Sequence, residues 1–309
     1  MAGAIGLRPE KEREMKKIIV VGGGAAGLMA AVSAAEGGAQ VTVLEKMAAV
    51  GRKLLITGKG RCNVTNVADI PTLIKNMPGN GAFLYSAFHA FNNEQLIEFL
   101  ARQQVPTKVE RGGRVFPQSD KAADVIQGFT RALAGRNVAI LTSQAVKAVL
   151  APDGAVTGVV TRQDQEYPAD AVILATGGAS YPGTGSSGDG YGMAQKLGHT
   201  IMPLKPSLVP LEVEERWITE LQGLSLKNVR ATVRHKERTV AAEFGEMLLT
   251  HYGLSGPIIL SLSKYVSELL EKPVCDLEAE TVQKGPDARK TEKARADSTF
   301  ERVRQARSR

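Results

Sequence analysis

The chain has 309 residues, of which 43% are hydrophobic and 23% are charged, as in ordinary soluble globular proteins with a large core. No apolar stretch reaches transmembrane length, because glycines and a proline interrupt the most apolar candidate, residues 247–262, and the N-terminus lacks the apolar segment of a signal peptide. We therefore expect a cytoplasmic protein with no membrane partner.

The net charge of +7 is concentrated at the two ends of the chain. Residues 1–17 carry +2 and residues 278–309 carry +3, which leaves a nearly neutral body. A nucleic-acid-binding face would concentrate basic residues on the folded part, so this distribution predicts no nucleic-acid partner. The two cysteines, Cys62 and Cys275, are far apart, and the histidines lack metal-ligand spacing, so we expect neither a disulfide framework nor a metal site.

A glycine motif follows the first predicted strand. Residues 18–21 form an apolar run without alternation, which is typical of a parallel strand that is buried on both faces. Gly22, Gly24 and Gly27 then fit the spacing G-x-G-x-x-G. The first glycine permits a tight turn, the second lets a diphosphate approach the backbone, and the third lets the next helix pack closely on the strand.

A helix and a second strand follow these glycines. Apolar residues recur at helical spacing from Ala25 onward, so the helix N-terminus, which includes Ala26, would direct its free N–H groups at phosphates. Residues 41–44 form an apolar strand that ends at Glu45 and Lys46. The Glu45 carboxylate can accept both ribose hydroxyls of an adenosine and would repel a 2′-phosphate. Together these features predict a dinucleotide-binding domain, and the alternative is a glycine turn in another α/β protein.

A basic loop follows at residues 51–66. It contains three glycines and four cations, namely Arg52, Lys53, Lys59 and Arg61. A flexible cationic backbone beside a dinucleotide fold suits a diphosphate, whereas the alternative is a solvated basic loop.

The middle of the chain predicts two helices and then a small β-meander. Asn92 or Asn93 is expected to cap one helix, and Ser119 is expected to cap another that ends near Leu133. The expected strands are residues 138–141, 146–150, 155–160 and 171–175, with a hairpin turn at residues 152–154.

The last of these strands ends in Ala-Thr-Gly-Gly at residues 175–178, and open α/β sheets bind ligands at such carboxyl ends. Asp189 lies at the start of the next helix, where the alternative role is a helix cap.

From residue 199 the pattern changes to short β-like pieces at 208–213 and 229–233. Beyond residue 278 large apolar residues are rare, so we expect a disordered tail or a loosely held helix there.

Several motifs in this order resemble a known family. G-G-G-A-A-G-L-M-A-A, G-R-K-L-L-I-T-G-K-G-R-C-N-V-T-N, R-V-F-P-Q-S-D-K-A, L-A-T-G-G-A-S-Y-P-G-T-G-S-S-G-D-G and G-E-M-L-L-T-H-Y-G-L-S-G-P resemble the bacterial FAD-dependent oxidoreductases known as HI0933-like, BaiN-like or aminoacetone oxidase-like flavoproteins. The resemblance covers about residues 16–270. It implies that the bound dinucleotide is FAD.

The resemblance also implies the domain organisation. We expect an α/β glutathione-reductase-type FAD-binding Rossmann domain with a β-meander at residues 16–198, and an incomplete β-rich inserted domain at residues 199–277. Residues 1–15 would form a disordered extension and residues 278–309 a polar basic tail. Family members return to the FAD domain after the insert, and no such segment is recognisable here, so we expect weakened flavin contacts and low activity in this form.

Cofactor residues follow from the resemblance, residue by residue. The positions expected to bind FAD are Gly22, Gly24, Ala25, Ala26, Gly27, Glu45, Lys46, Arg52, Lys53, Gly60, Arg61, Cys62, Asn63, Val146, Thr176, Gly177, Gly178 and Asp189. Val146 would contact the adenine through its backbone. No catalytic residue is assigned, because a flavin carries the chemistry and needs no acid–base triad.

The expected function is hydride transfer between a small organic substrate and FAD, with NAD(P)H as a second partner. The main alternative is a non-catalytic FAD- or nucleotide-binding fragment of such an enzyme. A flavin-dependent RNA-modifying protein is a further alternative, but the nearly neutral body does not offer the basic surface that it would need.

Overall fold

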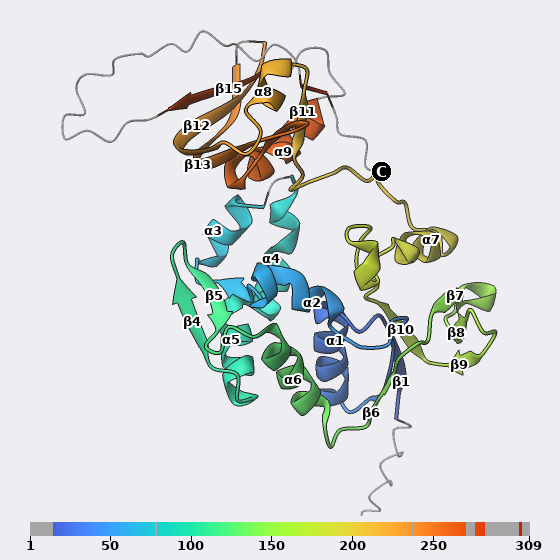
Figure 1. Cartoon of the computed structure of the whole chain (residues 1–309). Coiled ribbons are helices and arrows are strands. Elements are labelled where there is room, and N and C mark those ends of the chain that lie inside the picture. The colour runs from blue at the N-terminus through green and yellow to red at the C-terminus, as the bar shows by residue number, and fades with distance from the viewer. Residues whose placement is uncertain (1–14, 78, 237, 270–275, 282–302, 305–309) are drawn as a thin grey trace, which may run out of the picture. The chain divides into compact units, whose positions relative to one another are not determined.

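The computed structural model describes residues 15–77, 79–236, 238–269, 276–281 and 303–304. The chain divides into two compact units, residues 1–201 and 202–309 (Figure 1). Residues 1–14 of the expected extension, most of the expected tail and Cys275 lie outside the described residues. The roles expected for the separate domains stay predictions.

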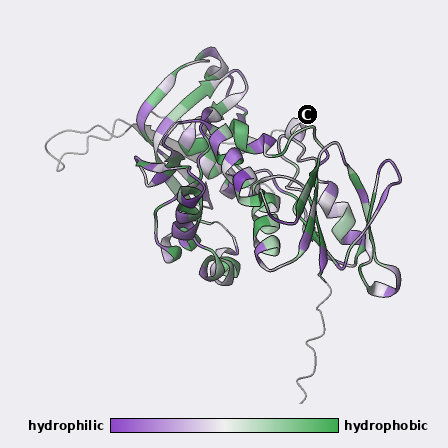
Figure 2. Cartoon of the chain, turned by 90° about the horizontal axis from the view of Figure 1, so that it is seen from below, coloured by the Kyte–Doolittle hydropathy of each residue, from purple (hydrophilic) through white to green (hydrophobic). Residues whose placement is uncertain are grey.

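A four-stranded parallel sheet forms the centre of the first unit (Figure 1). Its strands are β1 (Lys17–Val21), β2 (Gln40–Leu44), β6 (Val138–Leu141) and β10 (Ala171–Leu174). They lie in the order β10-β1-β2-β6, and every neighbouring pair is parallel. The four apolar runs expected to form strands do so, and their hydrophobic character is visible in Figure 2. The expected α/β fold class is thereby confirmed.

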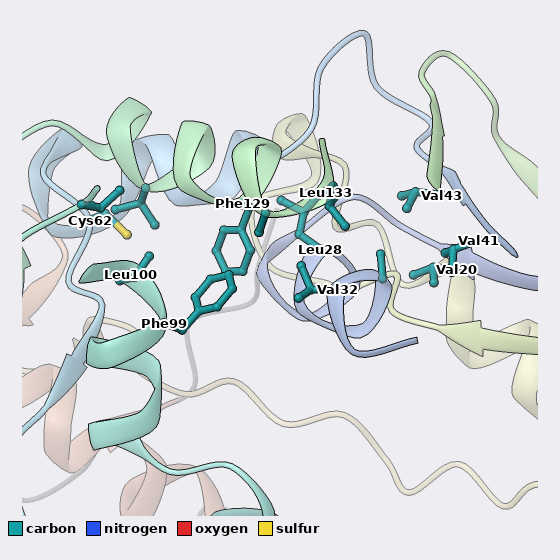
Figure 3. Close-up of a cluster of buried hydrophobic side chains, with 14 of the residues drawn as sticks. Val20, Leu28, Val32, Val41, Val43, Cys62, Phe99, Leu100, Phe129 and Leu133 are labelled. Atoms are coloured by element: carbon teal, nitrogen blue, oxygen red, sulfur yellow. The ribbon is translucent and has the colours of Figure 1, made fainter. Parts of the chain in front are cut away.

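Different elements contribute to the cores on the two faces of this sheet. One core joins β1 and β2 to three helices, α1 (Ala25–Glu36), α5 (Asn93–Arg102) and α6 (Ala122–Leu133) (Figure 3). In it the rings of Phe99 and Phe129 lie 5.4 Å apart. Val20 belongs to this core, whereas its neighbours Ile19 and Val21 belong to a second core on the opposite face. Because successive strand residues point to opposite faces, a doubly covered strand must be apolar throughout.

The second core is covered by an antiparallel meander. Its strands are β7 (Val146–Leu150), β8 (Gly158–Thr161) and β9 (Glu166–Pro168), and they pair in that order. The expected turn at residues 152–154 is present as a single 3₁₀ turn. Strand β8 begins three residues later than expected, at a glycine with φ +155°, where a Cβ atom would lie 2.2 Å from the Tyr167 carbonyl oxygen.

The two predicted helix caps have different outcomes. Asn92 caps α5 in a capping box, because its side chain accepts the Gln95 N–H at 2.8 Å and the Gln95 side chain accepts the Asn92 N–H at 2.8 Å. The prediction for Ser119 is wrong, since α6 begins at Ala122 with Lys121 as its N-cap. Asp120 has φ +57° and turns the chain just before the helix, so Ser119 lies too early to cap it.

Two glycines permit close backbone contacts at the end of β1. Gly22 has φ +108°, and a Cβ atom there would lie 2.5 Å from the Ala175 carbonyl oxygen. A Cβ atom on Gly27 would lie 1.8 Å from the Gly22 carbonyl oxygen. Gly24 differs, because a Cβ atom there would have no neighbour within 4 Å. Gly22 and Gly27 therefore permit close backbone packing, whereas Gly24 borders open space.

The segment between β2 and α6 also contains short elements. They are the helices α2 (Arg52–Ile56), α3 (Ile70–Lys75) and α4 (Tyr85–Ala90), and the strands β3 (Thr65–Asn66), β4 (Thr107–Glu110) and β5 (Arg114–Pro117). The three strands form an antiparallel sheet in the order β3-β5-β4.

Arg61 fastens its loop to this small sheet. Its Nη1 lies 2.8 Å from Glu110 Oε1 and 3.4 Å from Asp120 Oδ1, and its guanidinium carbon lies 4.1 Å from the centre of the Phe116 ring. Lys108 Nζ lies 2.5 Å from the second Asp120 oxygen. The hydrogen bond from Lys108, supported by the charges of both cations, holds the pKa of Asp120 below its usual range.

In the described residues of the second unit, an antiparallel sheet packs with two helices. Its strands are β11 (Leu211–Val213), β12 (Ser225–His235), β13 (Arg238–Thr250), β14 (Gly253–Ser255), β15 (Asp276–Thr281) and β16 (Val303–Arg304). They lie in the order β15-β12-β13-β14-β11-β16. Helices α8 (Arg216–Glu220) and α9 (Pro257–Leu269) add Ile218, Ile259 and Leu262 to its core.

Part of the polar tail is a strand, which corrects the expectation of disorder or a loose helix. Residues 276–281 pair antiparallel with β12, and residues 303–304 pair with β11. Strand pairing uses backbone groups that every residue other than proline carries, so a scarcity of apolar side chains does not prevent it.

The apolar stretch 247–262 is divided among β13, β14 and α9, and none of the described helices is both long and apolar enough to span a membrane.

The glycine geometry predicts opposite responses to two alanine substitutions. Gly27→Ala should lower the free energy of unfolding by about 1–3 kcal/mol, because the new methyl group meets the Gly22 carbonyl. Gly24→Ala should cost clearly less, since its methyl group meets no atom. Urea unfolding of both variants without added nucleotide measures the difference, and equal losses would contradict this account of the packing.

The Asp120 cluster predicts a pH-dependent contribution to stability. A carboxyl group whose pKa is lowered by folding stabilises the protein above its unfolded pKa, near 4, and this contribution disappears as the pH falls through the folded value. Asp120→Asn should therefore be less stable than the parent at pH 7, with a gap that narrows toward pH 3. Asparagine tolerates the left-handed backbone at this position, so the comparison isolates the charge. Urea unfolding at both pH values measures the difference in the free energy of unfolding between the two proteins. An equal difference at pH 7 and pH 3 would show that the ion pairs do not cause it.

Candidate functional site

A cavity of about 470 Å³ opens at the carboxyl ends of β1, β2 and β10. Its wall includes the last residue of each of these strands, Val21, Leu44 and Leu174. This is the edge at which open α/β sheets bind ligands, and the volume lies within the usual range for small-molecule sites. The cavity is formed entirely by residues of the first unit.

The start of α1 forms one wall of the cavity. Gly24, Ala25 and Ala26 line it, and Gly24 is the N-cap of the helix without a side-chain hydrogen bond. The first N–H groups of a helix have no partner inside the helix, and the dipole places partial positive charge at this end. This wall is therefore suited to an anion such as a phosphate.

Glu45 lies beside this wall and is 8% exposed. Its Oε2 accepts the Gly23 N–H at 2.7 Å, and its Oε1 accepts the Met47 N–H at 2.7 Å. The carboxylate thus connects the glycine loop to the end of β2. Each oxygen can accept a further hydrogen bond, so the group can also receive the two hydroxyls of a ribose.

An ion pair joins two other parts of the wall. Lys46 Nζ lies 2.6 Å from Asp189 Oδ2 and also donates a hydrogen bond to Ser187 Oγ. Asp189 is the first residue of α7 (Asp189–Lys196), whose N-cap is Gly188. The hydrogen bond from Lys46 lowers the pKa of Asp189, with smaller contributions from Ser187 and Arg162. The pair holds α7 close to the end of β2 and largely neutralises its own charge.

Two further cations line the cavity at α2. Lys53 Nζ donates to Ser180 Oγ at 3.1 Å and lies 6.0 Å from the centre of the Tyr181 ring. Arg52 is exposed and has no hydrogen bond or ion pair with any residue that the structure describes. Its guanidinium therefore remains available to an anionic group in the cavity.

Twelve of the expected cofactor residues line this cavity. They are Gly22, Gly24, Ala25, Ala26, Glu45, Lys46, Arg52, Lys53, Val146, Thr176, Gly177 and Asp189. They come from loops, helices and a strand that are far apart in the sequence, and they meet at one sheet edge. Their binding to FAD stays a prediction.

Six expected cofactor residues lie outside the cavity wall. They are Gly27, Gly60, Arg61, Cys62, Asn63 and Gly178. Gly27 supports the site indirectly through helix packing, and Arg61 is held by the two carboxylates described above. Cys62 is 1% exposed within the helical core, where burial raises the pKa of its thiol. Binding of FAD by these six residues stays a prediction.

Sequence reasoning missed several residues of the wall, including Ala49, Thr57, Gln144, Ser186 and Met193. Ser186 lies in the glycine- and serine-rich segment after β10, and that composition was a usable signal. Gln144 precedes β7 outside any recognised motif, so no sequence pattern marked it. Among the described residues, no group of His, Cys, Asp and Glu is arranged to hold a metal ion.

Comparison with known proteins relates the chain to reductases. The family model described as the HI0933-like protein Rossmann domain matches residues 16–265. A 3-dehydro-bile acid delta(4,6)-reductase of Clostridium scindens is 36% identical over 245 residues, covering 78% of this chain and 58% of the relative. A ribosomal RNA dihydrouridine synthase of Haemophilus influenzae is 32% identical over 243 residues, covering 77% of this chain and 58% of the relative.

A solved E. coli quinol fumarate reductase chain is 19% identical, with a TM-score of 0.49, over 70% of this chain and 44% of that one. This chain thus spans little more than half the length of the curated relatives that it matches. The family model confirms the expected Rossmann-type fold. The match over residues 16–265 shows that the chain belongs to the HI0933-like family.

Proposed function

We propose that the cavity of the first unit binds FAD, and that the protein is an oxidoreductase that transfers a hydride between the flavin and a small organic substrate. One observation carries this proposal. One cavity at the carboxyl edge of a parallel sheet is surrounded by the unobstructed Gly24, the uncapped start of α1, the Glu45 carboxylate and Arg52, which has no ion pair with a described residue.

The wall fits the two polar parts of an adenine dinucleotide. Gly24 leaves room for a diphosphate to approach the helix N-terminus, because a Cβ atom there would project into open space. Arg52 adds a cation to the same wall. Glu45 is placed to accept ribose hydroxyls, and its charge disfavours a nucleotide with a 2′-phosphate.

The bound flavin would supply the hydride chemistry. The residues of this chain would bind and orient its adenosine diphosphate half, and the Lys46–Asp189 ion pair would fix the wall between β2 and α7. NAD(P)H is proposed as the electron donor that reduces the cofactor before each turnover.

The names of the relatives support a substrate class. A delta(4,6)-reductase acting on a 3-dehydro bile acid and a dihydrouridine synthase both reduce a carbon–carbon double bond in a ring that carries a carbonyl group. In such a reduction a hydride adds to one carbon and a proton adds to the other. We therefore propose an α,β-unsaturated carbonyl compound as the substrate of this protein.

RNA is a second candidate substrate, because two relatives at 32% and 29% identity are named ribosomal RNA dihydrouridine synthases. This candidate opposes the prediction of no nucleic-acid partner. A non-catalytic FAD-binding role is the third. The first two candidates differ in which substrate oxidises the reduced flavin, and the third predicts a bound flavin that no donor reduces.

The purified chain should be yellow, and its visible spectrum should bleach when NADH or NADPH is added without oxygen. A steroid 4,6-dien-3-one added next should restore the colour and yield a product two hydrogens heavier, whereas a ribosomal RNA fragment should not. Mass spectrometry of steroid and RNA identifies the reduced species. Recovery with RNA alone would favour the second candidate, and bound flavin that no donor bleaches would favour the third.

Glu45→Gln should weaken FAD binding by roughly one to two decades, since charge-assisted hydrogen bonds contribute about 1.5–3 kcal/mol. Isothermal titration of FAD into the flavin-free protein measures the loss. Glu98→Gln is the matched control, because Glu98 is exposed on α5 and does not line the cavity. Equal affinities of the two variants would exclude Glu45 from the binding site.

The same variant separates binding from support of the loop. Because Glu45 also accepts two backbone N–H groups, Glu45→Gln should lower the melting temperature of the flavin-free protein. Gly24→Ala should weaken FAD binding with a smaller effect on that temperature, since its methyl group enters open space. Unchanged FAD affinity in Gly24→Ala would contradict the proposed approach of the diphosphate.

A further inference from the structure

Gln144 lies in the cavity wall beside Glu45 and has no role in the function proposed above. Its backbone N–H donates to the Glu45 carbonyl oxygen at 2.9 Å, and the preceding Ser143 N–H donates to the Met47 carbonyl oxygen at 3.0 Å. These two bonds fix the backbone of Gln144 against the end of β2. The side chain therefore starts from a defined position next to the carboxylate suited to a ribose.

The side-chain amide of Gln144 is incompletely satisfied. Its Oε1 is buried and has no hydrogen-bond partner among the described residues. Buried amide oxygens without a partner are uncommon in native proteins and destabilise the folded state. The terminal torsion of glutamine is broad, so the amide can turn toward the cavity without moving the backbone. A ligand that carries an N–H donor would relieve the cost.

The chemistry of the amide complements one part of the nucleotide. Glu45 offers only acceptors, whereas Gln144 offers an acceptor beside a donor. Adenine presents the matching pair, its exocyclic amine and the adjacent ring nitrogen N7, and glutamine binds this edge with two hydrogen bonds in nucleic-acid recognition. Hypoxanthine carries an oxygen in place of the amine and would oppose the amide oxygen.

We propose that Gln144 recognises the adenine base of the bound dinucleotide and selects adenine over 6-oxopurines. The inference rests on the proposed function, because it needs a dinucleotide in this cavity. Glu45 is placed to bind the ribose and cannot distinguish between bases, whereas Gln144 would do so.

The test compares ADP with inosine diphosphate, which differ only at the 6-position of the base and its ring N1 proton. The flavin-free full chain should bind ADP roughly tenfold or more tightly than inosine diphosphate. In Gln144→Leu the affinity for ADP should fall by about the same factor, and the affinity for inosine diphosphate should change by less than about twofold. Isothermal titration measures all four values.

A second measurement separates recognition from structural support. If the Gln144 oxygen lacks a partner in the empty protein, Gln144→Leu should keep or raise the melting temperature of the nucleotide-free form. Gln165→Leu is the matched control, because Gln165 is exposed in the turn between β8 and β9 and lies outside the cavity. It should preserve the preference for ADP.

The outcomes distinguish this inference from the proposed function. If the parent chain binds neither FAD nor ADP, both fail. If the parent prefers ADP and Gln144→Leu keeps that preference, the inference alone is wrong, and the partner of the amide is something other than the base, such as a bound water. If Gln144→Leu loses the preference for ADP and its nucleotide-free form also melts at a lower temperature, Gln144 has a structural role. This outcome would also overturn the inference.

Discussion

The arrangement of the first unit depends on two close backbone contacts at the end of β1, one between Gly22 and Ala175 after β10, and one between Gly27 of α1 and Gly22. A side chain at either position would collide with a backbone oxygen, and the glycine at position 27 lets α1 pack closely on the residue that follows β1. This contact fixes where the helix N-terminus lies, and with it the partial positive charge that faces the cavity. The helix packs through Leu28 and Val32 into the core that it shares with α5 and α6, and this packing holds the anion-binding wall in place.

Glu45 connects the glycine loop after β1 to the neighbouring strand β2. By accepting N–H groups from Gly23 and Met47, the carboxylate joins the glycine loop of β1 to the chain leaving β2. A buried carboxylate is costly unless hydrogen bonds satisfy it, and here two short ones do. The same group can therefore hold the loop and still present lone pairs to a ligand. A substitution of Glu45 therefore changes both the stability of the fold and the binding of the ligand. A substitution of Gly24 is expected to change mainly the binding, so the two variants together separate these effects.

Sequence reasoning succeeded where the determinants are local. The run from β1 through the glycines to α1 and β2 occupies fewer than thirty residues, and its strands and helix form as expected. The helix cap expected at Asn92 or Asn93 is similarly a local feature, and Asn92 forms it. Ser119 failed because the left-handed Asp120 moved the start of the helix, and no periodicity indicates a single backbone dihedral.

Other features of the structure depend on contacts between distant parts of the chain. Arg61 lies in a basic loop that suits a diphosphate, but its partners Glu110 and Asp120 come from segments about fifty residues later. Gln144 reaches the cavity only because its backbone bonds to Glu45 and Met47 hold that part of the chain there. Strand β15 arises from backbone pairing with β12, which composition does not reveal.

The charges around the cavity are sorted in a way that favours one orientation of a dinucleotide. Lys46 and Asp189 neutralise each other at 2.6 Å, so this pair contributes little net field. What remains is the negative Glu45 near the end of β2, and the helix N-terminus with Arg52 and Lys53 as positive features. Phosphates are repelled by the first and attracted by the others, whereas ribose hydroxyls donate well to a carboxylate. A dinucleotide that enters with its diphosphate toward α1 therefore satisfies both signs of charge, and the reversed orientation satisfies neither.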